Sequence, residues 1–343
     1  MEKTRIPIST VLVTGAEGFV GSELTAELLR RDCRVVKARR SSRAGRESCK
    51  QGLVPLHKVC QVSNPSFGHV EVGDIGPDTD WTTALSGIDA VVHLAARVHM
   101  MRDTAGDPLA EFRRVNVEGT CSLAKAAAKA GVRRLVFLSS VKVNGEATGK
   151  GERPFRETDL PHPEDDYGLS KWEAEQALKE IARQKGIEVA VIRPPLVYGP
   201  SVKANFLNLI RLIESGVPLP LGSIRNQRSF IGLKNLVDLI CRCLSHSAAA
   251  GETFLASDGY DVSTPELIRL VASALGKNVR LFSVPEWLVR AGGAISGKSK
   301  ELMRLCGSLQ IDSSKARQML DWTPPCTMVE ELTRVAAWRA MCR

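Results

Sequence analysis

Short apolar runs rich in β-branched residues alternate with helical patterns through the first part of this chain. The first run, residues 10–14 (Thr-Val-Leu-Val-Thr), has the composition of a parallel strand that is buried on both faces. Leucines at helical spacing follow over residues 22–31, and an alanine-rich helical pattern over 117–130 stops at Gly131. Further strand-like runs are predicted at residues 34–38, 69–72, 90–94, 135–139 and 189–193. The alternation predicts an α/β fold, a Rossmann-type doubly wound parallel sheet.

The pattern changes after Arg193, where the chain is interrupted by Pro194, Pro195, Gly199 and Pro200. Short helical segments, such as 265–276, then alternate with irregular ones. We therefore expect a first, sheet-forming domain over residues 1–195 and a smaller C-terminal domain over 196–343. The second domain is expected to lie over the carboxyl edge of the sheet and to supply substrate contacts, with some segments free to return to the sheet.

Charge and hydropathy limit the classes of partner. The 343 residues carry a formal net charge of +9, yet the densest basic stretch, residues 39–50, contains no aromatic side chain. A nucleic-acid-binding face would combine basic residues with stacking aromatics, so we expect no nucleic-acid partner and instead a small anion that carries phosphates. Apolar runs fall short of the roughly 20 residues of a membrane span. Because no signal-peptide pattern precedes the first strand, we expect a cytoplasmic protein without a membrane span.

Cysteine usage argues against a cross-linked or metal-binding protein. The nine cysteines are scattered, with no C-x-x-C pair and no histidine cluster near them. Such spacing predicts neither a disulfide framework nor a zinc site, so we expect no bound metal and reduced, mostly structural thiols.

Three glycines separate the first predicted strand from the first predicted helix, and they are Gly15, Gly18 and Gly21. In a dinucleotide-binding fold the first glycine permits a sharp turn and the second lets the backbone approach a pyrophosphate. The third lets the helix and strand pack closely. Free amides at the start of the helix then hold the negative charge. The spacing and its place after the first strand predict a dinucleotide cofactor.

The end of the second predicted strand indicates which dinucleotide binds. An NAD site would place an acidic side chain there for the ribose hydroxyls, whereas Arg39 and Arg40 stand at this point. A guanidinium can bind a 2′-phosphate in a bidentate fork, and an acid would repel it. We therefore expect NADP as the cofactor, with NAD as the alternative.

A tyrosine, a lysine and a serine form the candidate reactive group. Hydride transfer at a carbonyl needs a proton donor, and the reverse reaction needs a base. Tyr167 has an ordinary pKa of roughly 10, and Lys171, one helical turn later, adds positive charge that favours the phenolate. Ser140 follows a buried strand at its carboxyl end, where it can orient the reacting oxygen. Tyr-x-x-x-Lys alone is a weak signal, but with the glycines and the serine upstream the set predicts an oxidoreductase.

This combination resembles the extended short-chain dehydrogenase/reductases, and within them the nucleotide-sugar epimerase and reductase branch related to UDP-glucose 4-epimerase. The likeness runs through VTGAEGFVG, GDI, HLAA, NVEGT, SSVKVNG, YGLSK, RPPLVYGP, RSFIGL and DSSKARQMLDW. It implies that Ser140, Tyr167 and Lys171 are catalytic and that Asp74 contacts the adenine. It implies a cofactor held by Gly15, Gly18, Phe19, Val20, Gly21, Arg39, Arg40, Asp74, Ile75, Leu94, Ala95, Ala96, Asn116, Tyr167, Lys171 and Pro194.

The resemblance also implies a UDP-sugar substrate and a homodimer. Arg228 stands where an arginine binds the diphosphate, Arg304 is a candidate for a second such arginine, and Asn205 is a candidate contact to the sugar–phosphate region. Ser140 would touch the sugar itself. His93 is expected to be a packed core residue, Asp165 and Asp166 to cap a helix, and Tyr198 and Arg193 to be structural.

Departures from the family pattern narrow the activity. Related 4,6-dehydratases carry an Asp-Glu pair at positions 141 and 142, where this chain has Val141 and Lys142, so we do not expect dehydration. Our main expectation is a 4-keto reductase that makes a UDP-N-acetyl-deoxyhexosamine for surface polysaccharide, and a UDP-sugar 4-epimerase is the alternative. A reductase for a hydrophobic carbonyl and a non-catalytic dinucleotide sensor remain as further alternatives.

Overall fold

One parallel sheet organises the molecule. The computed structural model describes residues 6–40, 67–98, 106–149, 151–285, 288 and 305–342. Within these ranges seven strands form the sheet in the order β3-β2-β1-β4-β5-β6-β9. The strands are β1 (Thr10–Thr14), β2 (Arg34–Arg39), β3 (Phe67–Glu71), β4 (Ala90–His93), β5 (Arg134–Leu138), β6 (Glu188–Arg193) and β9 (Thr253–Leu255). The strand order reverses between β1 and β4, so the expected doubly wound sheet is confirmed, and the predicted strands lie within two residues of their expected bounds.

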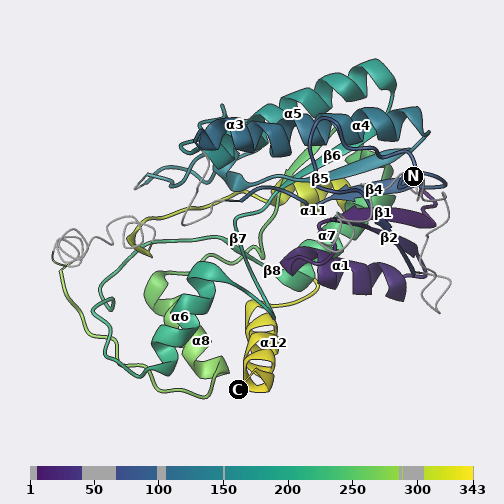
Figure 1. The fold of residues 1–343 in the computed structure, drawn as a ribbon. Coiled ribbons are helices and arrows are strands. Elements are labelled where there is room, and N and C mark those ends of the chain that lie inside the picture. Colours follow the sequence, from purple (N-terminus) through teal and green to yellow (C-terminus); the bar gives the residue numbers. More distant parts are fainter. Residues whose placement is uncertain are drawn as a thin grey trace.

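Helices cover both faces of the sheet (Figure 1). On one face lie α4 (Gly119–Lys129) and α5 (Asp166–Lys185), which pack against Leu12 of β1. On the other face α1 (Phe19–Arg30), α7 (Leu233–Ser245) and α11 (Ser314–Leu320) pack against Val11 and Val13. Successive side chains of a strand point to opposite faces, so a continuous apolar run such as β1 supplies both cores.

The helix predicted over 117–130 begins earlier than the sequence pattern indicated. The chain is helical from α3 (Pro108–Phe112) through a π-helical turn, η1 (Arg113–Glu118), into α4. The start at Val117 was therefore wrong, because the two arginines and Asn116 within the wider turn break the 3.6-residue apolar spacing. Such π turns occur often at functional sites, and this one contains Asn116.

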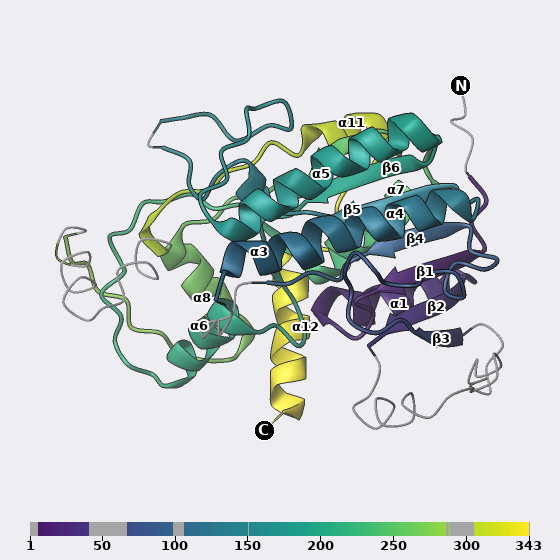
Figure 2. The ribbon, with the colours of Figure 1, turned by 45° about the horizontal axis from the view of Figure 1, so that its top comes forward.

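A second group of helices lies beyond the carboxyl edge of the sheet (Figures 1 and 2). It comprises α6 (Ala204–Glu214), α8 (Thr264–Ala274) and α12 (Met328–Met341), beside the two-stranded sheet of β7 (Leu196–Tyr198) and β8 (Phe230–Gly232). These elements share a core that includes Phe206, Ile210, Ile268 and Leu332. The described residues also form two short 3-10 helices, η2 (Val141–Val143) and η3 (Ser247–Ala249).

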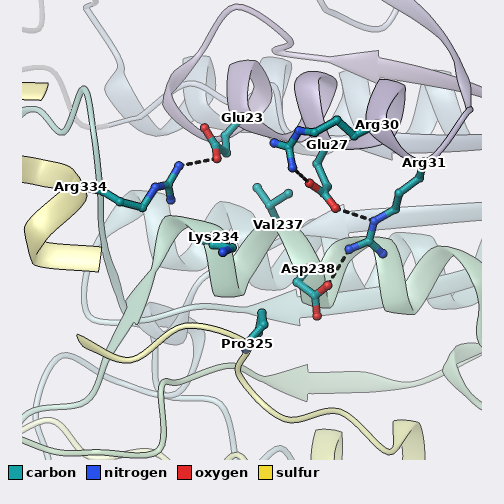
Figure 3. Close-up of a pocket in the computed structure, with 9 residues that line it drawn as sticks. All are labelled: Glu23, Glu27, Arg30, Arg31, Lys234, Val237, Asp238, Pro325 and Arg334. Atoms are coloured by element: carbon teal, nitrogen blue, oxygen red, sulfur yellow. Dashed lines mark hydrogen bonds and ion pairs between the residues drawn. The ribbon is translucent and has the colours of Figure 1, made fainter. Parts of the chain in front are cut away.

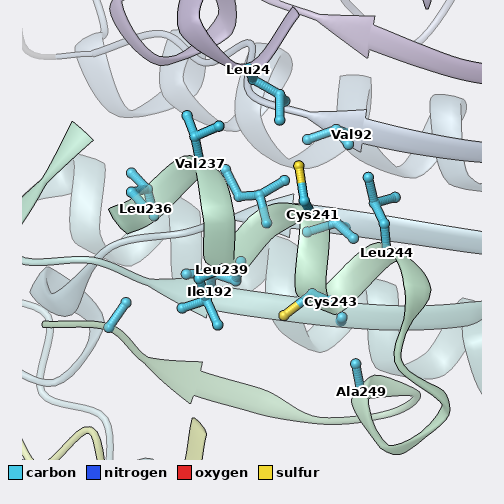
Figure 4. Close-up of a cluster of buried hydrophobic side chains, with 14 of the residues drawn as sticks. Leu24, Val92, Ile192, Leu236, Val237, Leu239, Cys241, Cys243, Leu244 and Ala249 are labelled. Atoms are coloured by element: carbon cyan, nitrogen blue, oxygen red, sulfur yellow. The ribbon is translucent and has the colours of Figure 1, made fainter. Parts of the chain in front are cut away.

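Parts of the chain after residue 195 belong to the main sheet layer. Strand β9 extends the sheet beside β6, and α7 packs against β5 and beside α1. Figure 4 shows the side chains of α7, with Cys241 and Cys243, among Leu24, Val92 and Ile192. Burial raises the pKa of both thiols to about 12, as expected for unreactive structural cysteines.

Ion pairs join the first helix to the C-terminal elements around a surface hollow (Figure 3). Arg31, the C-cap of α1, reaches Asp238 of α7, with 2.6 Å between Nη2 and Oδ1. Arg334 of α12 reaches Glu23 of α1, also with 2.6 Å between nitrogen and oxygen. The side chains of this hollow connect the sheet layer to the second helical group. Across the ranges described above, no helix is both long and apolar enough to span a membrane.

Candidate functional site

The glycine turn after β1 has the backbone geometry that the sequence predicts. Gly15 has a φ of +68°, and a Cβ there would lie 2.9 Å from the backbone nitrogen of Ala95. A Cβ on Gly21 would lie 2.1 Å from the carbonyl oxygen of Gly15, so neither position accepts a side chain. Helix α1 begins at Phe19 and ends its first turn at Ser22 without an acidic residue. This close-packed turn fits a dinucleotide, whose pyrophosphate the first amides of α1 can bind.

The end of β2 differs from the sequence-based expectation. Arg39 Nε lies 2.8 Å from Oε1 of Glu17, a residue of the glycine turn itself. Arg40 Nε lies 3.4 Å from Oδ1 of Asp74, which follows β3. Acidic side chains are therefore present where the sequence places the adenosine of the cofactor (the adenosine end of the site), although β2 supplies none. The acids partly neutralise the charge of the two arginines. The lack of an acidic residue at the end of β2 is therefore no longer an argument for NADP over NAD. Glu17 lies two residues after Gly15, which is the signal that could have identified it.

The segment after β4 is held against the switch point of the sheet. The amides of Leu94 and Ala95 donate to the carbonyl and hydroxyl oxygens of Thr14, at 3.3 and 3.2 Å. Leu94, Ala95 and Ala96 are half-buried beside the glycine turn. Ligands of doubly wound sheets bind at this switch point, so the structure brings the predicted cofactor residues of β1 and β4 together.

Asn116 fastens this segment to the helices. Its Oδ1 accepts from the amide of Arg97 at 2.7 Å, and its Nδ2 donates to Arg97 O and to Ser170 Oγ, both at 3.0 Å. Both amide hydrogens are thus used within the protein. Ile75, after Asp74, packs close to Gly119 at the start of α4. The geometry gives Asn116 a positioning role beside the cofactor residues.

His93 is a core residue, as predicted. Its Nδ1 forms a hydrogen bond with the hydroxyl of Thr14 at 2.7 Å, and its Nε2 forms one with the hydroxyl of Thr120 at 2.9 Å. Burial, with a smaller contribution from Lys171, lowers its pKa to about 3. The imidazole therefore stays neutral near physiological pH and packs against Phe137.

Ser140 and Lys171 meet at the carboxyl end of β5. Ser140 caps η2, and its Oγ accepts from the amide of Lys142 at 3.2 Å. Lys171 Nζ donates to Leu138 O at 2.8 Å and lies 5.9 Å from the ring centroid of Tyr167. Helix α5 packs against η2, so the serine, tyrosine and lysine come from two neighbouring segments. The structure thus brings together the three residues that the sequence selected.

The electrostatics of this group differ from the simple picture of a lysine that creates a phenolate. Burial, together with the nearby Asp165, raises the pKa of Tyr167 above its ordinary value. Burial lowers the pKa of Lys171 to about 7, against a smaller opposing effect of Glu175. Without further positive charge Tyr167 is a phenol, which is the form that donates a proton.

A buried ion pair between Glu175 and Arg193 lies next to the reactive group, and the sequence analysis did not identify it. Glu175, fully buried one turn after Lys171, accepts from Arg193 at 3.0 and 2.6 Å and from Ser139 Oγ at 2.5 Å. Arg193, buried at the end of β6, also donates to Asn144 Oδ1 at 3.0 Å. The structural role expected for Arg193 is confirmed. The i, i+4, i+8 spacing of Tyr167, Lys171 and Glu175 was the available signal.

The candidate substrate residues lie on the second helical group and its connections. Arg228 is half-buried, and its Nη1 donates to Gly307 O at 2.9 Å. Asn205 is exposed in the first turn of α6. Arg304 lies outside the described residues. Pro194 is buried, and its carbonyl accepts from the amide of Val141 at 3.0 Å, beside the Ser140 segment.

Tyr198 is structural, as expected, because its buried hydroxyl donates to Asp258 Oδ2 at 2.7 Å. Asp165 is the N-cap of α5, whereas Asp166 is the first residue of the helix itself. Across the described residues, no group of histidine, cysteine and acidic side chains is arranged to hold a metal ion.

Comparison with known proteins identifies the family of the chain. Residues 11–256 match the NAD dependent epimerase/dehydratase family. A Vibrio cholerae protein named UDP-glucose 4-epimerase is 44% identical over 328 residues, which cover 95% of this chain and 94% of that protein. Among solved structures, UDP-glucuronic acid 4-epimerase from Bacillus cereus in complex with NAD has a TM-score of 0.73 at 22% identity, covering 97% of this chain and 99% of that one.

A second solved structure, MoeE5 in complex with UDP-glucuronic acid and NAD, is 25% identical with a TM-score of 0.70. It covers 98% of this chain and 100% of its own. The family match spans most of the chain and contains the glycine turn, Ser140, Tyr167 and Lys171. The chain is therefore an enzyme of the NAD dependent epimerase/dehydratase family.

Proposed function

We propose that this enzyme exchanges a hydride and a proton at carbon 4 of a UDP-sugar, with Ser140, Tyr167 and Lys171 as its reactive residues. The observation that carries the proposal is their convergence at the carboxyl end of β5, on the sheet edge that also holds the glycine turn. The names of the relatives support the substrate class, since UDP-glucose or UDP-glucuronic acid appears in each.

A nicotinamide cofactor, when bound, would accept or return the hydride, and in its oxidised form it would add positive charge. Tyr167 takes the proton of the 4-hydroxyl when the sugar is oxidised and returns it when the 4-keto group is reduced. Ser140 holds the same oxygen through its hydroxyl. Lys171, whose pKa burial lowers to about 7, shares the positive charge that makes the phenolate accessible.

The 4-epimerase is the activity we propose first. After oxidation at carbon 4, the keto sugar turns over and receives the hydride on its other face, so no external reductant is consumed. The V. cholerae relative, 44% identical over nearly the whole chain, carries this activity in its name. Glu17 and Asp74 at the adenosine end suit the ribose hydroxyls of NAD. Lys142 stands where a 4,6-dehydratase carries an acid, which argues against dehydration as the activity of this enzyme.

A 4-keto reductase of a UDP-N-acetyl-deoxyhexosamine is the second candidate, because Arg39 and Arg40 stand at the end of β2. Such an enzyme exchanges its cofactor in each turnover, which suits NADPH. The arginines are paired with acids, yet each keeps terminal guanidinium nitrogens beyond the paired Nε.

One experiment separates the two activities. The purified protein is incubated with UDP-glucose or UDP-N-acetylglucosamine without added cofactor, and separately with a UDP-4-keto sugar and NADPH. Interconversion of the 4-epimers in the first assay supports the epimerase. Consumption of NADPH without epimerisation supports the reductase. If Tyr167→Phe retains full activity, the assigned chemistry is wrong, and if neither assay shows turnover the sensor alternative stands. Arg228→Ala tests the substrate class, because loss of a diphosphate contact raises the Michaelis constant for a UDP-sugar.

A further inference from the structure

Lys142 lies between two acidic side chains beside the reactive serine. Its Nζ is 2.7 Å from Oε1 of Glu146 and is also paired with Oδ2 of Asp165. The lysine side chain is 27% exposed and Asp165 is 31% exposed, so the pair is partly shielded from water. The backbone of the same residue donates to Ser140 Oγ. One residue thus contacts Ser140 through its amide and Asp165 through its ammonium group.

Asp165 connects this contact to the first turn of α5. Its Oδ1 accepts from the amide of Gly168 at 2.7 Å and caps the helix that carries Tyr167. The carbonyl oxygen of Lys142 also packs closely against this turn, because a Cβ on Gly168 would lie 2.9 Å from that oxygen. The segment after Ser140 and the turn that holds Tyr167 are therefore in direct contact at residue 142.

We propose that Lys142 is a positioning residue that clamps the Ser140 segment to the first turn of α5 and offsets the negative charge of Asp165 beside Tyr167. The inference rests on the proposed function, in which Tyr167 exchanges the proton. It assigns a role to a lysine that takes no direct part in the proposed proton exchange.

The charged groups around Tyr167 decide the sign of the effect. Asp165 and Asp166 stand at the start of its helix, and Lys171 stands one turn later. Lys142, on the segment after β5, is paired with Asp165 and with Glu146. On the side of α3, Phe112 meets the tyrosine ring edge-on, and Arg97 lies over Phe112.

Removal of the ammonium group leaves Asp165 and Glu146 without their shared cation. Asp165 already raises the pKa of Tyr167, and an unopposed carboxylate raises it further. In the direction that needs Tyr167 as a base, the acidic limb of the kcat profile should then move to higher pH.

The test compares pH profiles of kcat for the wild type, Lys142→Met, Lys142→Arg and Lys142→Met/Asp165→Asn, with the UDP-sugar that the wild type turns over. We expect the acidic limb of Lys142→Met to move up by about one pH unit, a typical effect of one nearby charge. Lys142→Arg keeps the cation and should match the wild type. The double variant should return towards the wild-type profile, because asparagine still caps the helix without the charge.

Arg153→Met is the matched control, since it breaks an ion pair with Asp159 on the same stretch of chain, where the arginine is 59% exposed. Its profile should not move. A profile of Lys142→Met that coincides with the wild type, or a fall in kcat that is equal at every pH, would overturn the proposal. If Lys142→Met does not fold, Asp165→Asn alone should move the limb to lower pH, and an unmoved limb again overturns it. Activity that persists in Tyr167→Phe would instead contradict the proposed function, so the two failures are distinguishable.

Discussion

The two ends of the candidate site hold their charges in different ways. At the chemical end, Lys171 and Glu175 are almost completely buried, Lys171 donates to Leu138 O, and Glu175 accepts from Arg193. At the adenosine end, the side chains of Arg39 and Glu17 are 36% and 65% exposed. Water screens the exposed charges of the adenosine end but not the buried charges of the chemical end. An equal change in charge should therefore have a large effect at the chemical end and a small effect at the adenosine end.

The largest effect is expected from the tyrosine hydroxyl. Tyr167→Phe keeps the ring and its contact with Phe112 but removes the group that exchanges the proton. Loss of a general acid–base group reduces kcat by about 10²- to 10⁴-fold. Stopped-flow or steady-state assays measure kcat, and NAD binding should change little. Tyr260→Phe, at an exposed tyrosine, is the control that keeps full activity.

The buried ion pair below the site should dominate stability. Glu175→Gln leaves the guanidinium of Arg193 buried without its carboxylate, which costs about 3–5 kcal/mol of unfolding free energy. Urea titration followed by circular dichroism measures this loss. On the same helix, Glu180 pairs with Arg183 at the surface, where the arginine is 73% exposed. Glu180→Gln should leave the unfolding midpoint unchanged, and an equal loss in both variants would refute the distinction between buried and exposed pairs.

Lys171 should make stability depend on pH. Burial lowers its pKa to about 7 from an ordinary value of 10.5, so above pH 7 the unfolded chain holds a proton that the folded protein has released. Folding stability therefore rises with pH over this range. Cys241 and Cys243, with raised pKa values, oppose the trend above about pH 9.

Unfolding free energies at pH 7 and pH 9 measure the effect. Relative to Lys171→Met, the wild type should gain about 2 kcal/mol between these two pH values. Parallel pH dependence in the two proteins would show that the lysine keeps its proton when folded.

The smallest effect is expected at the adenosine end. Glu17→Gln frees Arg39 from its acid and should improve NADPH binding by no more than about tenfold, because exposed ion pairs contribute about 1 kcal/mol or less. Arg39→Ala should weaken NADPH more than NADH, and Arg39→Asp should favour NADH. Fluorescence titration of both cofactors measures these constants. Equal changes for NADH and NADPH would show that neither Glu17 nor Arg39 lies near the ribose.

Some of these features follow from the sequence alone, because they depend on local geometry. The turn at Gly15 needs a positive φ, and Gly21 must lack a side chain, so the three glycines specify the turn wherever it occurs. The apolar runs specify buried strands, and the four-residue spacing of Tyr167 and Lys171 places both on one face of a helix. The doubly wound sheet and the placement of Tyr167 and Lys171 on one helix were therefore predictable.

Only the tertiary structure decided which charges compensate one another. Glu17 meets Arg39, Lys142 meets Asp165, and Glu175 meets Arg193 across 18 or more positions of the chain. The tertiary structure also placed α7 and β9 in the sheet layer, although both lie after residue 195, in the part of the sequence expected to form the second domain. Periodicity and backbone preference act between near neighbours in sequence, whereas the energy of a charge depends on its burial and on distances that exist only after the chain has folded.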